Sequence, residues 1–321
     1  MRIEANTLYA CPDCGARGWT VSGATEGEGE MCCNACAASY AIKQSIPRFV
    51  EPENYAASFG FQWNRHARTQ LDSFTGRTVS RDRLFGVTGW AEDLKGQRIL
   101  EAGSGAGRFT EVLAATGGEI HSFDYSLAVD ANSSNNGGKE NVHLFQGNIF
   151  SMPFVPGGFD KVMCLGVIQH TPDPARAFRC LAAQVKPGGE LAIDVYASRL
   201  SAWLHWRWLL RPITRRMDKQ RLYRIVSAVT PVLLPVAVLL RRLAGRYGAR
   251  LVPVVEFSDL DLPPKLHVQW AILDTFDWYS PAFDFPQSRA TVERWFADAG
   301  FVDVNVGYGP NGVVGRGRRP L

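Results

Sequence analysis

The feature that most constrains this chain is a glycine-rich turn between an apolar strand pattern and an amphipathic helix pattern. The run Ile99-Leu-Glu-Ala-Gly-Ser-Gly-Ala-Gly107 leads directly into Arg108-Phe-Thr-Glu-Val-Leu. Its three glycines remove side chains where the strand turns into the helix, so the backbone can approach a ligand closely. A strand, a glycine turn and a helix in this order predict the first unit of a doubly wound α/β sheet.

Further strand patterns follow the glycine turn at regular intervals. They cover residues 119–123, 142–145, 159–165 and 190–195, with a helix pattern over 175–185 and a Lys-Pro-Gly-Gly terminator at 186–189. Together with residues 98–102 they predict five strands of a parallel α/β sheet. A capped helix over 288–300 and strands over 301–306 and 312–316 are expected after a large insertion, residues 197–285.

The residues around the glycine turn indicate the kind of ligand. A dinucleotide fingerprint would need glycine where Arg108 stands, so that fit fails. Glu101, at the end of the strand, would repel a pyrophosphate but suits a ligand with an ammonium group. Asp124, at the end of the next strand, is placed to bind ribose hydroxyls. A ligand with a ribose, a cation and no phosphate is S-adenosylmethionine.

The order of these motifs resembles that of class I methyltransferases of the small-molecule type. The resemblance covers residues 95–198 and rests on 99–107, 123–126, 146–149, 159–162, 165–174 and 185–189. It implies a Rossmann-like, seven-stranded, mostly parallel sheet with helices on both faces. It also implies a cofactor site made by Glu101, Ala102, Gly103, Ser104, Gly105, Asp124, Tyr125, Asn148, Ile149 and Leu165. The family often has Asp at position 148, but Asn can still accept a hydrogen bond from the adenine amino group.

The resemblance implies methyl transfer by in-line attack of a nucleophile on the sulfonium methyl, and an oxygen nucleophile also needs a base. The candidate bases are His170, Asp277 and Tyr279, each of which also has a purely structural interpretation. The expected acceptor is a small molecule or a lipid-like compound. Two alternatives stay open: an RNA or tRNA methyltransferase, although no RNA-binding signature is visible, and a scaffold that binds the cofactor without turnover.

The N-terminal region predicts a metal site. Five of the seven cysteines lie in the first 36 residues, and Cys11, Cys14, Cys33 and Cys36 form two C-x2-C pairs with zinc-ribbon spacing. Four thiolates close a tetrahedral structural zinc site, which must supply folding energy because few large apolar residues lie between the pairs. Cys32 could replace Cys33, but only Cys33 keeps the C-x2-C spacing. A disulfide cluster is disfavoured because no secretion signal accompanies it. Residues 1–50 resemble the zinc ribbons of methyltransferases and their activator subunits.

Residues 199–252 carry the basic excess of the chain, with twelve Lys or Arg and one acid, Asp218. Their apolar run Ile225–Leu240 has 16 residues and two prolines, Pro231 and Pro235, which we expect to kink a helix and to leave it short of a membrane span. The segment predicts either a lid with solvated arginines or a helix pair at an anionic membrane surface.

The resulting domain organisation has four parts. Residues 1–50 are the zinc ribbon, 51–92 a helical connector over the cofactor site, 93–198 with 286–321 the methyltransferase core, and 199–285 an insertion that caps the substrate site. Because no secretory pattern is visible, we expect a cytoplasmic protein, peripheral to the membrane if the basic segment contacts lipid. The sequence does not indicate an oligomeric state.

Overall fold

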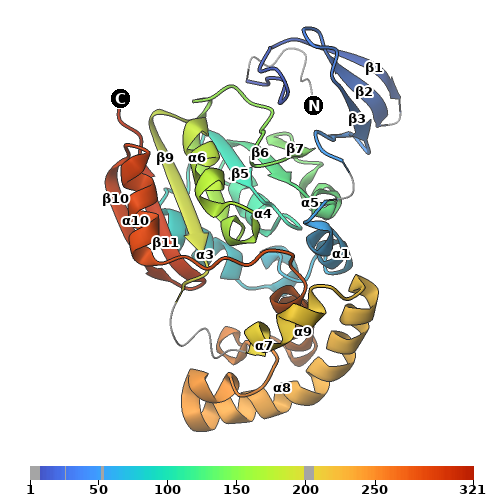
Figure 1. Ribbon diagram of the computed structural model, residues 1–321, viewed down its shortest axis with the longest axis vertical. Helices are drawn as coiled ribbons and strands as arrows, with labels where there is room; N and C mark the ends of the chain where they lie inside the picture. Colours follow the sequence, from blue (N-terminus) through green and yellow to red (C-terminus); the bar gives the residue numbers. More distant parts are fainter. Residues whose placement is uncertain (1–7, 26, 52–53, 199–205) are drawn as a thin grey trace.

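The centre of the protein is a seven-stranded sheet, seen in a computed structural model that describes residues 8–25, 27–51, 54–198 and 206–321 (Figure 1). The strand order is β10-β11-β9-β8-β5-β6-β7. Strands β5 to β9 pair in parallel, while β11 runs antiparallel to β9 and β10. The predicted Rossmann-like sheet is confirmed. The strands are β5 (Arg98–Ala102), β6 (Glu119–Asp124), β7 (Val142–Gln146), β8 (Phe159–Leu165), β9 (Val185–Val195), β10 (Val302–Gly309) and β11 (Gly312–Arg318).

Helices cover both faces of this sheet. One face carries α3 (Val79–Thr88), α4 (Arg108–Ala114) and α5 (Ala128–Asn136), and the other carries α6 (Pro174–Gln184) and α10 (Arg289–Asp298). The predicted capped helix is confirmed, because the Ser288 hydroxyl accepts a hydrogen bond from the Thr291 amide at 3.0 Å at the start of α10. Apolar side chains from each helix layer fill one of two separate cores.

Strand β9 begins earlier than the sequence indicated. We expected the Pro-Gly-Gly stretch to end α6 and to precede the strand, but β9 starts at Val185 and includes it. The pairing with β8 shifts register between Phe159 and Lys161, and Gly188 has a positive φ of 75°. An irregularity with a glycine in the left-handed region lets a strand continue across such a stretch.

The N-terminal ribbon is a four-stranded antiparallel sheet formed by β1 (Trp19–Thr25), β2 (Glu28–Cys33), β3 (Ser39–Lys43) and β4 (Ile46–Pro47). It joins the large sheet beside β7, where the Phe49 amide donates to Gln146 O at 2.9 Å. Arg48 also forms an ion pair with Asp130 of α5 at 2.5 Å. Aromatic contacts run from Trp19 through Phe49 to Phe145, so the ribbon shares the core of one face of the sheet.

The remaining helices lie beyond the carboxyl ends of the central strands. They are α1 (Ala57–Arg65) and α2 (Asp72–Thr75) from the connector, and α7 (Trp206–Thr214), α8 (Lys219–Ala249) and α9 (Pro264–Tyr279) from the insertion. Figure 1 shows α7, α8 and α9 together at the end of the molecule opposite the ribbon. The first part of the basic segment, residues 199–205, lies outside the described residues.

Helix α8 corrects two expectations. It continues through Pro231 and Pro235, and its backbone leaves helical values only at Ala244 and Gly245. An interior proline leaves one backbone carbonyl of the preceding turn without its hydrogen bond, and a helix can tolerate this where tertiary packing supports it. Helix α8 has such support because it packs along α9. The apolar helical stretch Lys219–Gly245 is also long and apolar enough to cross a bilayer by length and composition, with 28% of its most apolar window buried. The expectation that the apolar run Ile225–Leu240 falls short of a membrane span is therefore corrected as far as length and composition are concerned.

Candidate active site

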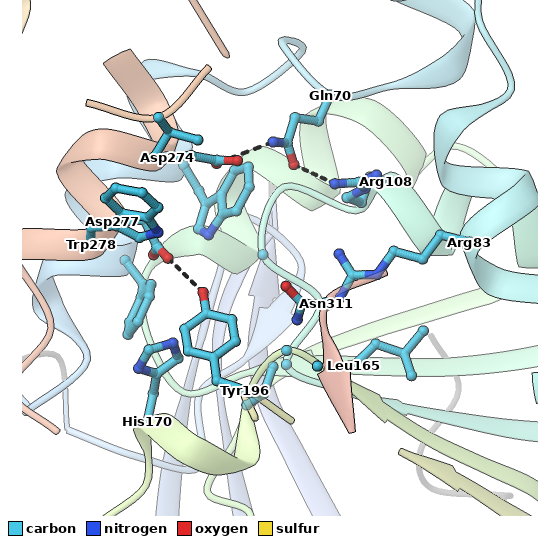
Figure 2. A pocket seen from close by; sticks show the side chains of 18 of the residues that line it. Gln70, Arg83, Arg108, Leu165, His170, Tyr196, Asp274, Asp277, Trp278 and Asn311 are labelled. Carbon is cyan, nitrogen blue, oxygen red and sulfur yellow. Dashed lines mark hydrogen bonds between the residues drawn. The ribbon is translucent and has the colours of Figure 1, made fainter. Parts of the chain in front are cut away.

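A cavity of about 690 Å³ lies at the carboxyl ends of the parallel strands, where open α/β sheets bind ligands. The loops after β5, β6, β8 and β9 form one wall. The insertion and its flanks form the other wall, which Figure 2 shows from close by. This volume is large enough for a cofactor and a second small molecule together.

The glycine turn after β5 forms the floor of one end of the cavity. Gly103, Gly105 and Gly107 have φ values of 81°, 53° and 85°, which side-chain-bearing residues rarely adopt. A Cβ at Gly107 would lie 2.0 Å from Asn132 Oδ1, so no side chain fits there. Trp63 of α1 closes the turn from above, because a Cβ at Gly105 would lie 3.1 Å from its ring. Sequence reasoning missed Trp63 because no local pattern links it to the turn.

Asp124, the predicted ribose ligand, lines the cavity at the end of β6. Its Oδ2 accepts a hydrogen bond from the Gly105 amide at 2.9 Å, and its Oδ1 accepts two from Ser126. Burial raises the pKa of this carboxyl. A carboxylate has about four lone-pair positions, so Asp124 can still accept a hydrogen bond from a ribose hydroxyl. The carboxyl thus joins the two strand ends that the cofactor would contact.

Glu101, the predicted partner of an ammonium group, lies just beneath this floor and does not line the cavity. Its side chain is 1% exposed, and its Oε2 accepts hydrogen bonds from Thr110 Oγ1 at 2.5 Å and Ser122 Oγ at 2.7 Å. Oε1 is buried and has no hydrogen-bond partner among the described residues. Burial raises the pKa of Glu101 to about 7. A buried oxygen without a partner fits a cationic ligand group that would approach it.

The other predicted cofactor residues divide into two groups. Gly103, Ser104, Gly105, Tyr125, Ile149 and Leu165 line the cavity. Ala102, within β5, and Asn148 do not. The Asn148 Oδ1 accepts a hydrogen bond from the Phe150 amide at 3.0 Å, so this side chain holds the turn after β7. Ile149 is the residue of this turn that reaches the cavity.

His170 and Asp277, two of the predicted bases, both line the second half of the cavity. The His170 Nδ1 lies 3.0 Å from the Phe283 carbonyl oxygen, which can only accept, so Nδ1 carries the proton and Nε2 of the neutral ring is an acceptor. The Tyr196 hydroxyl donates to Asp277 Oδ2 at 3.1 Å, and its ring meets that of His170 edge-on at 5.3 Å (Figure 2). Burial raises the pKa of Asp277. Sequence reasoning missed Tyr196, although its place directly after β9 was a usable signal.

Tyr279, the third predicted base, does not line the cavity. Its hydroxyl donates to the Pro253 carbonyl oxygen at 2.9 Å, and its ring is buried in the apolar cluster between α8 and α9. The hydroxyl therefore fastens α9 to the segment after α8 and does not face an acceptor in the cavity.

Charged side chains of both signs lie in the wall of the cavity. Gln70 connects two of them, because its amide donates to Asp274 at 3.3 Å and accepts from Arg108 at 2.6 Å (Figure 2). Burial, together with the neighbouring Asp277, raises the pKa of Asp274 to about 7. Arg83 forms a forked ion pair with Asp194. A wall of mixed sign differs from the uniformly basic surface that a nucleic-acid backbone selects.

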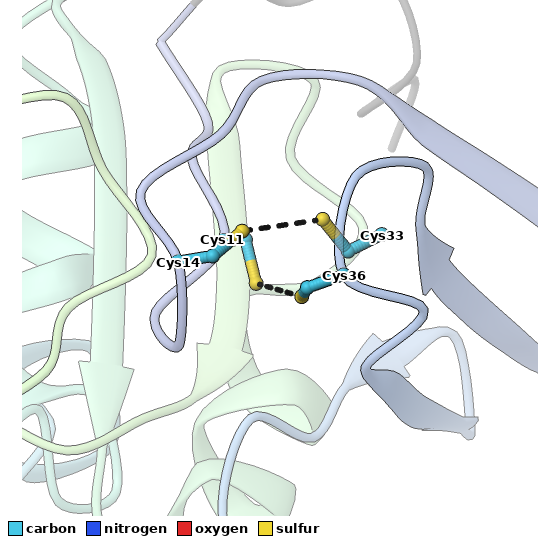
Figure 3. A group of neighbouring side chains, drawn as sticks. All are labelled: Cys11, Cys14, Cys33 and Cys36. Atoms are coloured by element: carbon cyan, nitrogen blue, oxygen red, sulfur yellow. Dashed lines mark hydrogen bonds between the residues drawn. The ribbon is translucent and has the colours of Figure 1, made fainter.

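The four cysteines of the ribbon converge on one point (Figure 3). The Sγ atoms of Cys11 and Cys36, and those of Cys14 and Cys33, are 3.7 Å apart, and all four sulfurs lie within 4.8 Å of one another. Sulfurs bound at about 2.3 Å in a tetrahedron around zinc are separated by about 3.8 Å, so this arrangement fits a zinc ion.

The two cysteine turns have the same backbone structure. The Gly15 amide donates to Cys11 O at 2.8 Å, and the Ala37 amide donates to Cys33 O at 3.0 Å. Hydrogen bonds from the backbone amides of Cys36 and Ala35 lower the pKa of Cys33 to about 7, which favours the thiolate. Of the two alternatives, Cys33 belongs to the cluster, whereas the Cys32 Sγ contacts Ser39 Oγ at 3.7 Å and lies outside it.

Comparison with known proteins gives one family match, the methyltransferase domain family, over residues 100–193. An uncharacterized protein of Synechococcus is 32% identical over 163 residues, which are 49% of this chain and 36% of that protein. A ubiquinone biosynthesis O-methyltransferase of Coxiella burnetii is 29% identical over 114 residues, which are 35% of this chain and 49% of that enzyme. The chain thus matches half or less of the length of these relatives.

Among solved structures, the complex of the Haloferax volcanii Trm112 methyltransferase activator with a methyltransferase is similar, with 13% identity and a TM-score of 0.45 over 85% of this chain and 100% of that one. The family match includes the glycine turn and the strand ends that line one end of the cavity. Residues 100–193 therefore match the methyltransferase domain family, in agreement with the resemblance of the sequence motifs.

Proposed function

We propose that this protein transfers a methyl group from S-adenosylmethionine to an oxygen atom of a small, partly apolar acceptor. The observation that carries the proposal is a single cavity that joins the glycine turn and Asp124 to His170 and Asp277. A cofactor end and a proton-accepting end in one cavity are what an aligned transfer to a hydroxyl requires.

The cofactor, when bound, supplies an electrophilic methyl group on a sulfonium. On the protein side, Asp124 would accept hydrogen bonds from the ribose, and Tyr125 and Ile149 would border the adenine. Tyr55 packs on Tyr125 with ring centroids 4.8 Å apart and extends this aromatic wall. Glu101 would balance the ammonium charge from beneath the floor, since its Oε1 is the buried oxygen without a partner.

The acceptor hydroxyl would lose its proton to His170. The Phe283 carbonyl holds the proton on Nδ1, so Nε2 is the atom that can take another. Asp277, which accepts from Tyr196 and lines the same part of the cavity, would stabilise the imidazolium that results. The Phe59 ring also packs on the imidazole, with ring centroids 5.1 Å apart, and would help to keep water away from it.

The wall contributed by the insertion supports an acceptor with an apolar part. Four apolar side chains lie in this wall: Val254, Val255 and Phe257 from the segment after α8, and Trp278 from α9. The curated relatives include O-methyltransferases of ubiquinone biosynthesis, which is consistent with transfer to an oxygen atom. We therefore propose a phenol or a similar hydroxyl compound with an apolar portion as the acceptor class.

Cofactor binding is the first test. Calorimetric titration with S-adenosylhomocysteine should show binding by the wild type, and Asp124→Asn should weaken it by about tenfold or more, because one charged hydrogen-bond acceptor is lost. Gly103→Arg should abolish binding, whereas Gly86→Arg, at an exposed position of α3 with open space around it, should leave it unchanged. A wild type without affinity for S-adenosylhomocysteine would refute the proposal.

Turnover is the second test. Transfer of a labelled methyl group to fractions of a bacterial lipid and metabolite extract should yield a methylated product, which mass spectrometry can identify. His170→Gln should reduce kcat by about 10²- to 10⁴-fold with little change in S-adenosylhomocysteine affinity, the range found for a lost general base. Cofactor binding without turnover on any fraction would leave the scaffold function instead.

For the ribbon we propose one structural zinc bound by Cys11, Cys14, Cys33 and Cys36. Four protein ligands close the coordination sphere, so the ion would have no free position for catalysis. The support is the fit of the sulfur separations to a tetrahedral ion. Its role would be to hold the ribbon against β7 and α5.

A further inference from the structure

Helix α8 has two apolar faces. One face packs on neighbouring elements and buries Leu222, Val226, Leu234 and Ala237. The opposite face exposes a row of apolar side chains at intervals of three and four residues, which is the spacing of one helix face. We call this row the α8 stripe: Ile225, Val229, Val232, Val236, Leu239 and Leu243. A continuous exposed apolar row of this kind marks an interaction surface.

The α8 stripe has no polar break before its C-terminal end. Between Ile225 and Leu239, the exposed residues outside the row are Ala228, Pro231 and Pro235. The exposed fractions of Val232 and Leu243 are 71% and 74%, so most of the surface of these residues is open to solvent. At a rise of 1.5 Å per residue, the stripe from Ile225 to Leu243 is about 27 Å long.

Arginines border the stripe at both ends. Five exposed arginines precede the stripe or stand near its C-terminal end, and none has an acidic partner within 4 Å among the described residues: Arg215, Arg216, Arg221, Arg224 and Arg242. The acid of this segment, Asp218, caps α8 by accepting from the Arg221 amide. A dry apolar row with cations at its ends is complementary to acyl chains below anionic headgroups.

The structure also corrects which basic residues are available. Arg207 and Arg211 lie near the buried Asp284, and Arg241 pairs with Glu256 and Asp259. These three therefore point into the protein, and the basic surface is smaller than the sequence count. The five arginines named above have no acidic partner within 4 Å among the described residues, so the net charge is positive where the apolar row begins and ends.

We infer that α8 is an interfacial helix that seats the protein on an anionic lipid bilayer. The helix would lie in the plane of the membrane, with the stripe among the acyl chains and the bordering arginines at the headgroups. Because the other face of α8 packs on α9, lipid reaches one side of the helix only. This inference does not depend on the proposed methyl transfer.

Vesicle flotation of the full chain tests the inference. The probes are phosphatidylcholine vesicles and phosphatidylcholine vesicles with one-third phosphatidylglycerol. The wild type should float with the anionic vesicles about tenfold more than with the neutral ones, since each basic residue near the surface contributes several-fold. Val232→Glu with Leu239→Glu should abolish flotation. Arg221→Glu with Arg242→Glu should remove the preference for anionic lipid.

A matched control places two glutamates elsewhere on the surface. Val302→Glu with Val304→Glu, at exposed apolar positions of β10, should float like the wild type. Circular dichroism should show the same helix content for all variants, because the substituted side chains are exposed. Equal flotation of the wild type and the Val232/Leu239 variant would overturn the inference, as would wild-type protein that stays in solution with both vesicles.

Two further outcomes would replace the inference with another function of the stripe. If sedimentation shows a wild-type dimer that the Val232→Glu with Leu239→Glu variant dissociates, and neither protein floats, the stripe is the contact between two copies. If the wild type leaves the vesicles only with detergent and not at high salt or alkaline pH, α8 spans the bilayer and is not interfacial.

Discussion

The ionisation of Glu101 gives a quantitative test of the burial of this side chain beneath the glycine turn. Burial raises its pKa from 4.5 to about 7, while the unfolded chain ionises near 4.5. Between these pH values the native protein holds a proton that the unfolded chain releases, so stability falls as the pH rises. A shift of about 2.5 pH units at 1.36 kcal/mol per unit gives a loss of about 3 kcal/mol, complete above pH 7.

Glu101→Gln removes this ionisation and keeps the shape of the side chain. Urea unfolding from pH 5 to pH 8 should show the wild type losing about 2.5 kcal/mol relative to Glu101→Gln, because part of the total loss is already present at pH 5. The difference between the two proteins is the observable, because it cancels the other titrating groups. Glu140→Gln, at an exposed position, should follow the wild type at every pH. Parallel stability curves for the wild type and Glu101→Gln would refute a buried, protonated Glu101.

The same residue links pH to ligand binding. If the cofactor ammonium pairs with ionised Glu101, binding below pH 7 must first remove the proton, and wild-type affinity for S-adenosylhomocysteine should fall by about tenfold per pH unit there. Titrations at pH 6 and pH 8 should show this fall in the wild type and none in Glu101→Gln. An equal fall in both proteins would place the ammonium elsewhere.

Three further predictions concern the ribbon and the glycine turn. Cys36→Ser should reduce the zinc content from one ion per chain toward zero by metal analysis, whereas Cys32→Ser should retain it, because only the former side chain faces the cluster. Arg48→Ala should destabilise the protein by about 1 to 2 kcal/mol in urea unfolding, since it removes the partner of the partly exposed Asp130, and a loss below about 0.5 kcal/mol would argue against that pair. Gly107→Ala should cost at least about 1 kcal/mol in the same assay because its Cβ would meet Asn132, and an unchanged midpoint would contradict the tight turn.

Local sequence patterns were sufficient to predict the sheet, the position of the glycine turn and Asp124 at its carboxyl edge, and the grouping of the cysteines. Alternating apolar patterns and glycine turns are local signals, and the carboxyl ends of parallel strands meet at one edge. Gly103 and Asp124 could therefore be placed at one site from their positions in the chain. The C-x2-C spacing likewise predicted which four cysteines come together, because a short turn directs two thiolates to one point.

Which residues of distant segments share the cavity depends on tertiary packing. Trp63, Tyr196 and Asp277 come from α1, the end of β9 and α9, and no sequence spacing relates them. Packing also separates Tyr279 and Asn148 from the cavity, because the polar group of each side chain forms a hydrogen bond with a backbone atom elsewhere. Helix α8 packs on α9 and remains helical through its two prolines. The same packing buries one face of its apolar run and leaves the other face exposed. Local propensity cannot distinguish those two faces, since their side chains are equally apolar and differ only in what lies opposite them.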